Sequence, residues 1–179
     1  MIGSYTIFNS VTTLGKFFKL VDGKLDKTVS CELHTGDYAM RYFNSADDFL
    51  KQLTEVSGSQ VISASVPVNG TTTGGITTRA KPREGSLART KENFKFPDGP
   101  GIMTMDYDPS GVVLSREELI NLLRTVADIP EDGALIWWCS GSSYIYNGDE
   151  ELQGLKGQRI YLLVENARDI PRAGKALAD

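Results

Sequence analysis

The segment Gly101-Ile-Met-Thr-Met-Asp-Tyr-Asp108 predicts a buried β-strand that ends in two carboxylates. Side chains two apart on a strand point to the same face, with α-carbons roughly 6.5 Å apart, so Asp106 and Asp108 can reach the same one or two hard cations. Tyr107 should then face the opposite side. Because adjacent carboxylates repel each other, a divalent ion that neutralises them is favoured at this position.

The ion expected at this strand end is Mg²⁺ or Mn²⁺, which bridges phosphates and activates an attacking hydroxyl in phosphoryl transfer. The alternative interpretation of Asp106 and Asp108 is a solvated junction between strand and turn. Asp is also a turn residue, and Pro109-Ser-Gly111 follows directly. The pair alone does not decide between these two interpretations.

Downstream of this strand the sequence predicts a helix, two strands and a last helix. The capping box Ser115-Arg-Glu-Glu118 begins a helix with a broad apolar face. Residues 134–139 and 159–164 are nearly continuous apolar runs, which are typical of strands covered on both faces. Pro171, with Asp169 as a cap, predicts the last helix.

Upstream, the sequence predicts a hairpin, a helix, a strand and a loop. Residues 4–33 are interpreted as one β-hairpin, with an Asp-Gly turn at residues 21–24. Ser45 caps a helix through residue 56, a strand covers residues 61–66, and residues 69–75 form a glycine-rich flexible connection. The whole pattern predicts an α+β fold with α/β-type layers, in which helices cover a mixed β-sheet.

Length and composition favour one soluble globular domain over residues 1–179. Apolar residues make up 40% of the chain and charged residues 23%, which excludes a disordered or fibrous class. The apolar runs are far shorter than the roughly 20 residues that span a bilayer, and the N-terminus has no secretory pattern, so a cytoplasmic location is expected. A net charge of −4 argues against an overall basic coat. Cys31 and Cys139 are expected to be buried, reduced thiols.

Local basicity is concentrated in residues 79–95, which carry six basic residues against two acidic ones. This segment predicts either a flap that contacts phosphates or a solvated surface. The basic residues are Arg79, Lys81, Arg83, Arg89, Lys91 and Lys95.

Three further groups of polar or aromatic residues have two interpretations each. The turn Ser140-Gly-Ser-Ser143 can line a triphosphate with hydroxyl and backbone donors, or simply close a turn. Trp137 and Trp138 are expected in the core and under a helix, with base stacking as the alternative. His34, the only histidine, has no motif around it and is assigned a structural role.

An ordered series of motifs in residues 76–175 resembles the N-terminal primase-polymerase region of plasmid, phage and genomic-island replication proteins. These proteins belong to the archaeo-eukaryotic primase superfamily. The motifs are Ile76-Thr-Thr-Arg79, Leu87-Ala-Arg-Thr-Lys-Glu-Asn-Phe94, Phe96-Pro-Asp-Gly-Pro-Gly101, Met105-Asp-Tyr-Asp-Pro109, Ser140-Gly-Ser-Ser143, Ile145-Tyr-Asn-Gly148 and Leu155-Lys-Gly-Gln-Arg-Ile-Tyr161.

The resemblance implies a metal-dependent DNA primase or polymerase, with a primase-polymerase catalytic core and an RRM-like sheet. Asp106 and Asp108 stand at the superfamily's first metal motif and would be the catalytic, metal-binding residues. Arg159 stands where the second motif usually has a histidine, and with Ser142 and Ser143 it would bind the incoming nucleoside triphosphate. The single-stranded DNA template would be held by Arg79, Arg89 and Lys91. A helicase domain or subunit is an implied partner.

The superfamily's third motif, an acidic residue on a later strand, should follow the helix at Pro171, but the sequence ends at Asp179. We therefore expect an N-terminal fragment of a longer replication protein or a shortened relative; Glu165 is a less favoured substitute ligand. The alternative function is a catalytically inactive module of the same fold that binds nucleic acid or a replication partner. A metal-dependent nuclease is a third reading, for which the sequence offers no general base.

Overall fold

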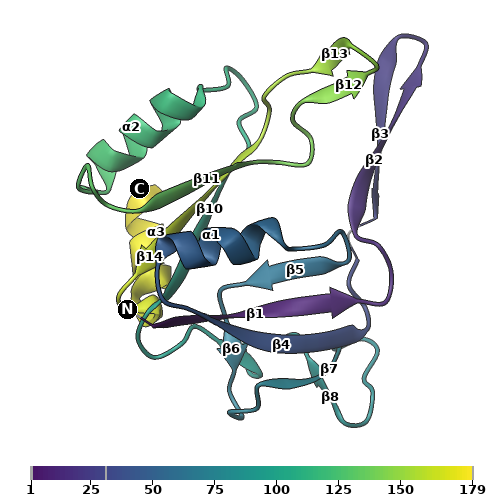
Figure 1. Cartoon of the computed structure of the whole chain (residues 1–179). Helices are drawn as coiled ribbons and strands as arrows, with labels where there is room; N and C mark the ends of the chain where they lie inside the picture. Colours follow the sequence, from purple (N-terminus) through teal and green to yellow (C-terminus); the bar gives the residue numbers. More distant parts are fainter. Residues whose placement is uncertain (1, 31, 179) are drawn as a thin grey trace. The chain divides into compact units, whose positions relative to one another are not determined.

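The computed structural model describes residues 2–30 and 32–178, and it has the predicted mixed α+β class (Figure 1). The chain divides into two compact units, which are described separately. The first unit comprises Met1–Ile102 with Val164–Arg168, and the second comprises Met103–Leu163 with Asp169–Asp179. Among the described residues, none of the helices combines the length and apolar character needed to cross a membrane.

The first unit is built on a five-stranded sheet in the order β5-β1-β4-β7-β8. Its pairs are antiparallel except for β7 and β8, which run parallel, so the sheet is mixed as predicted. The short strands β6 and β9 form a separate antiparallel pair. The bounds are β1 Gly3–Ser10, β4 Gly36–Phe43, β5 Gln60–Ser63, β6 Val66–Pro67, β7 Thr73–Thr77, β8 Ser86–Ala88 and β9 Phe94–Lys95.

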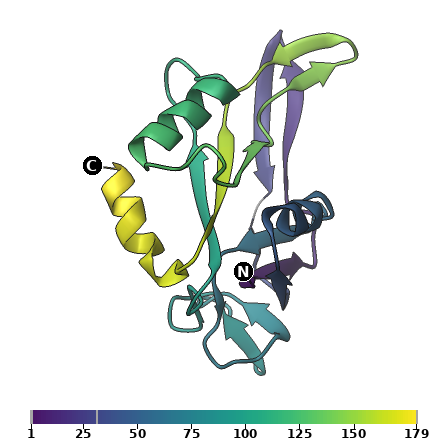
Figure 2. The ribbon, with the colours of Figure 1, turned by 60° about the vertical axis from the view of Figure 1, so that its left-hand side comes forward.

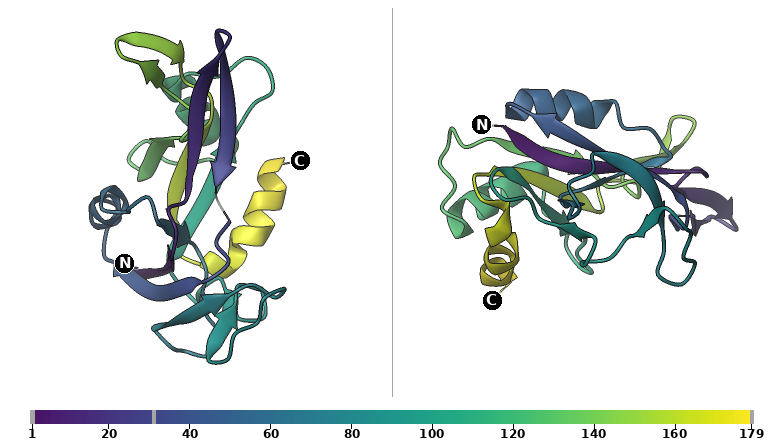
Figure 3. Two further views of the ribbon diagram at one scale, coloured as in Figure 1. Left: turned by 90° about the vertical axis from the view of Figure 1, so that its right-hand side faces the viewer. Right: turned by 90° about the horizontal axis from the view of Figure 1, so that it is seen from below.

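Helix α1 (Ala46–Thr54) begins at the predicted cap, where the Ser45 side chain accepts a hydrogen bond from the Asp48 amide at 3.1 Å. The helix lies along one face of the five-stranded sheet (Figures 1 and 3). Its Phe49 ring meets Tyr5 of β1 edge-on at 5.4 Å between centroids and Phe43 of β4 at 5.6 Å. All three rings are fully buried, so this cluster fixes α1 on the sheet.

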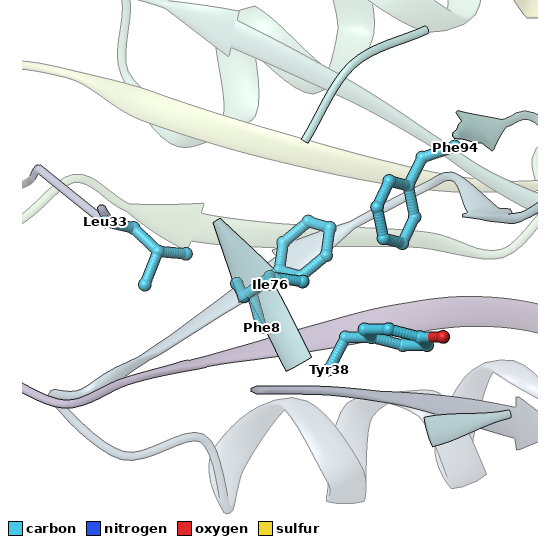
Figure 4. Packing of buried hydrophobic residues seen from close by; sticks show 5 residues of the cluster. All are labelled: Phe8, Leu33, Tyr38, Ile76 and Phe94. Carbon is cyan, nitrogen blue, oxygen red and sulfur yellow. The ribbon is translucent and has the colours of Figure 1, made fainter. Parts of the chain in front are cut away.

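The opposite face of the same sheet carries a second apolar cluster (Figure 4). The Phe94 ring packs edge-on against Phe8 at 5.1 Å and against Tyr38 at 5.4 Å between centroids. Ile76 and Leu33 complete the cluster. Because both faces are covered, β1 is buried at four consecutive positions, Tyr5 to Phe8.

This burial explains why the single hairpin predicted for residues 4–33 is wrong in its first half. Strand β1 pairs with β4 and β5, and only β2 (Gly15–Val21) and β3 (Lys24–Ser30) form the hairpin. The Asp-Gly turn is confirmed, with Asp22 and Gly23 both in the left-handed region at φ 50° and 72°. Phe17 of this hairpin is 55% exposed, so its side chain is not part of the hydrophobic core.

Two other predictions for the first unit need correction. The predicted strand over residues 61–66 is two strands, because a turn joined by the Ser63 and Ser65 hydroxyls, 2.7 Å apart, separates β5 from β6. The predicted flexible connection over residues 69–75 runs into β7, which pairs with β4. A Cβ on Gly74 would lie 2.9 Å from the Tyr38 ring. The absence of a side chain at Gly74 therefore leaves room for the buried Tyr38 ring.

Tyr5 should make the free energy of unfolding of the first unit depend on pH. Its hydroxyl donates to Gln52 Oε1 at 2.8 Å, and burial raises the pKa of Tyr5 to about 12 from its usual 10.0. Above about pH 10 the unfolded chain loses this proton while the folded chain keeps it, so the free energy of unfolding should fall between about pH 10 and 12. Urea unfolding of the wild type and of Tyr5→Phe over this range tests the expectation. A fall of the same size in both proteins would assign it to other groups.

The second unit holds a three-stranded sheet in the order β10-β14-β11 and a hairpin, β12-β13. Helices α2 and α3 lie on the same side of the three-stranded sheet (Figures 2 and 3). A short 3₁₀ helix, Ala167–Asp169, precedes α3. The bounds are β10 Gly101–Tyr107, α2 Arg116–Val126, β11 Leu135–Cys139, β12 Ile145–Asn147, β13 Glu150–Gln153, β14 Gln158–Val164 and α3 Ile170–Ala178.

The capping box of α2 is confirmed atom for atom. Ser115 Oγ accepts from the Glu118 amide at 3.2 Å, and Glu118 Oε2 accepts from the Ser115 amide at 2.8 Å. The prediction of full cover for residues 134–139 is wrong at Ala134, which is exposed, and at Trp138, which is 38% exposed. Cys139 is a free, partly buried thiol, and Cys31 lies outside the described residues.

Candidate functional site

The two carboxylates lie at the C-terminal end of β10 on its open face. Thr104, Asp106 and Asp108 are exposed, whereas Met103 is buried. Tyr107 is partly buried, and its hydroxyl accepts a hydrogen bond from the Leu114 amide at 3.4 Å. The alternation along this strand is therefore the one that the sequence predicts.

Arg159 reaches Asp106 from the neighbouring strand β14. Its Nε donates to Asp106 Oδ1 at 2.6 Å, and the two side chains are 46% and 64% exposed, respectively. The hydrogen bond that Arg159 donates to Asp106 raises the pKa of Arg159, although burial opposes the shift. An ion pair this exposed contributes at most about 1 kcal/mol to stability. Because both side chains are about half exposed, their charges remain accessible to a ligand.

The turn Ser140–Ser143, called the serine turn below, follows β11 and contacts residues 156–157, which lead into β14. The Ser140 amide donates to the Gly157 carbonyl at 2.8 Å. The Ser143 hydroxyl donates to that carbonyl at 3.0 Å and accepts from the Lys156 amide at 3.0 Å. Ser142 and Ser143 are only 6% and 7% exposed. The Ser143 hydroxyl is thus engaged in holding the turn, which is a structural role beside its predicted nucleotide contact.

Gly157 is a site residue whose role the sequence did not reveal. A Cβ at this position would lie 2.8 Å from Ser140 Oγ and 3.3 Å from Asp108 Oδ1. The missing side chain therefore lets the Asp108 carboxylate and the serine turn approach the same point of the backbone. In the sequence the only signal is a glycine immediately before an apolar strand.

Gln158 is a second residue that sequence reasoning missed. It is 1% exposed, accepts from Trp137 Nε1 at 2.6 Å and donates to the Leu114 carbonyl at 2.7 Å. Arg116 lies over the Trp137 ring, 5.9 Å from its centroid. The Gln158 amide therefore ties β14, β11 and the segment before α2 together, directly beside Arg159. In the sequence the only signal is an amide side chain directly before the apolar run of residues 159–164.

The residues predicted to hold a template belong to the first unit. Arg79 forms an exposed ion pair with Glu92 at 3.1 Å, and Lys91 is exposed. Arg89 Nη2 donates to the Leu33 carbonyl at 2.5 Å, its guanidinium lies 5.9 Å from the centroid of the Phe8 ring, and burial lowers the pKa of Arg89. Arg89 therefore has a structural role in the first unit although its side chain remains exposed, and Arg79 and Lys91 also present their charges to solvent.

The donor chemistry of the site fits a small hard cation. Mg²⁺ is commonly held by one or two carboxylates together with substrate phosphates and water, which Asp106 and Asp108 can satisfy. Within residues 2–30 and 32–178, no group of three or more His, Cys, Asp or Glu side chains is arranged to hold a metal. His34 is exposed and pairs with Glu32 at 2.8 Å, and Glu165 is exposed in the first unit.

Comparison of the chain with protein-family models, with curated proteins and with solved structures gives no match.

Proposed function

We propose that this protein is a primase-polymerase domain, a metal-dependent nucleotidyl transferase that acts in the replication of a plasmid, phage or other mobile element. The observation that carries the proposal is that Arg159 donates a hydrogen bond to Asp106 at the end of β10, two residues before the exposed Asp108. Carboxylates for a cation and a guanidinium for phosphate are the two kinds of group that a metal–triphosphate complex requires.

The Asp106–Arg159 ion pair leaves binding capacity on both residues. Arg159 Nε contacts only Oδ1 of the carboxylate, so Oδ2 remains for a cation. The guanidinium carries further N–H donors, which suit phosphate oxygens. In this proposal Asp106 and Asp108 hold Mg²⁺ or Mn²⁺, and Arg159 orients Asp106 and contacts the triphosphate. The cation, when bound, neutralises phosphate charge and activates the attacking hydroxyl.

The proposal also assigns roles to the other predicted site residues. The serine turn with Ser142 and Ser143 forms the wall of the nucleotide site next to Asp108. Arg79, Arg89 and Lys91 contact the backbone of a single-stranded DNA template. A helicase domain or subunit is the proposed replication partner.

Calorimetric titration of a nucleoside triphosphate, with Mn²⁺ and then with EDTA at the same salt concentration, tests the site. The wild type should show binding that depends on Mn²⁺, and Asp106→Asn with Asp108→Asn should lose that difference. Asp149→Asn, an exposed acidic residue in the β12–β13 turn, is the matched control and should behave as wild type.

Equal Mn²⁺ dependence in the wild type and the double variant would place the site elsewhere and overturn the assignment of Asp106 and Asp108. No binding by the wild type would overturn the nucleotide site itself.

A catalytically inactive binding module of the same fold is the second candidate. The observation that favours it is that Arg159 already balances the charge of Asp106 without any cation. Such a module would bind single-stranded DNA and give no Mn²⁺-dependent product in a primer-extension assay. A primase-polymerase would incorporate nucleotides in that assay, and Asp106→Asn would abolish the incorporation.

A further inference from the structure

Trp138 and Trp137 are neighbours in β11 and have opposite surroundings. The Trp137 indole is hydrogen-bonded to Gln158 and lies beneath Arg116, on the side of the sheet where the segment before α2 packs. Because consecutive strand residues alternate, the Trp138 indole belongs to the other face, and it is 38% exposed. A large aromatic surface is therefore offered to solvent on the face that carries Asp106.

The strand register places Trp138 in one row with the charged residues of the site. Trp138 of β11 is the direct partner of Arg159 of β14 in the antiparallel ladder. Arg159 in turn bonds to Asp106 of β10, which completes a row across all three strands. Neighbouring strands lie about 5 Å apart, so the row from indole to carboxylate covers about 10 Å. A nucleotide has a comparable extent from its base to its outer phosphates.

We propose that Trp138 is the stacking platform for the nucleobase of a nucleoside triphosphate whose phosphates lie toward Arg159 and Asp106. This inference rests on the proposed function, and it adds the residue that recognises the base. Every base has an aromatic face, so stacking on an indole discriminates little between bases. The site therefore binds the four nucleotides with similar affinity, and any choice between them comes from pairing with a template.

Two probes separate base recognition from phosphate recognition: ATP and inorganic tripolyphosphate, each titrated calorimetrically with Mn²⁺. Tripolyphosphate carries the phosphates and no base. Trp138→Ala should weaken ATP binding by about five- to a hundredfold and leave tripolyphosphate binding within about twofold of wild type. Trp138→Phe keeps an aromatic face and should restore most of the ATP affinity. Tyr146→Ala removes another exposed aromatic of the second unit and should change neither titration.

The outcomes distinguish failure of this inference from failure of the proposed function. If wild type binds tripolyphosphate as tightly as ATP, or if Trp138→Ala leaves ATP binding unchanged, the stacking platform is overturned and the metal–phosphate site stands. Equal weakening of both probes by Trp138→Ala, without rescue by Trp138→Phe, would show that Trp138 only supports the sheet. If wild type binds neither probe, the proposed function fails, and this inference fails with it.

Discussion

Replacing Phe49 by alanine should lower the free energy of unfolding of the first unit by about 3–5 kcal/mol. Phe49 is fully buried, and its ring contacts both Tyr5 and Phe43, so truncation leaves a cavity between α1 and the sheet. Urea unfolding followed by circular dichroism measures the loss.

The neighbouring variant Leu50→Ala is the matched control for this prediction. Leu50 belongs to the same helix but is 37% exposed, so its truncation should cost less than about 1 kcal/mol. A similar loss in both variants would mean that the aromatic cluster does not determine the stability of this region.

Replacing Gln158 by methionine should destabilise the second unit by about 2–4 kcal/mol, because two buried groups lose their partners. The substitution keeps the volume of the side chain but leaves the Trp137 indole N–H and the Leu114 carbonyl without the hydrogen bonds at 2.6 and 2.7 Å. Hydrogen exchange of the β11 and β14 amides, together with urea unfolding, measures the effect.

Gln153→Met is the control, since Gln153 lies in the β12–β13 hairpin and is only partly buried. Its replacement should change stability by less than about 0.5 kcal/mol. If Gln158→Met changed the stability as little as Gln153→Met, the hydrogen bonds of the buried amide would not contribute to stability. The sheet would then hold Arg159 in place without them.

Elements with a local signal were predicted well. The two helices with caps at Ser45 and Ser115 begin where their sequences indicate, because a capping residue acts within one turn of its own helix. The strand that carries Asp106 was also predicted. The errors concern β1 and β7, whose assignment depends on partners far away in the sequence. Strand pairing is non-local, so neither a turn signal nor a run of glycines determines it.

The candidate site divides in the same way. The shared exposed face of Asp106 and Asp108 follows from the two-residue period of a strand, and the sequence predicts it. The bond between Arg159 and Asp106, the cross-strand position of Trp138 and the bridging amide of Gln158 depend on the order and register of β10, β14 and β11. No residue pattern specifies that register in advance, so these features emerge only from the fold.

The placement of the tryptophans has a consequence for spectroscopy. Both indoles of the chain lie in β11, so intrinsic tryptophan emission reports on the second unit alone, while the first unit contributes only tyrosine and phenylalanine. The two emitters also differ, because Trp137 is partly buried and hydrogen-bonded to Gln158, whereas Trp138 is 38% exposed. A collisional quencher in solution therefore reaches one indole well before the other, and the chain carries separate internal probes for the two faces of a single strand.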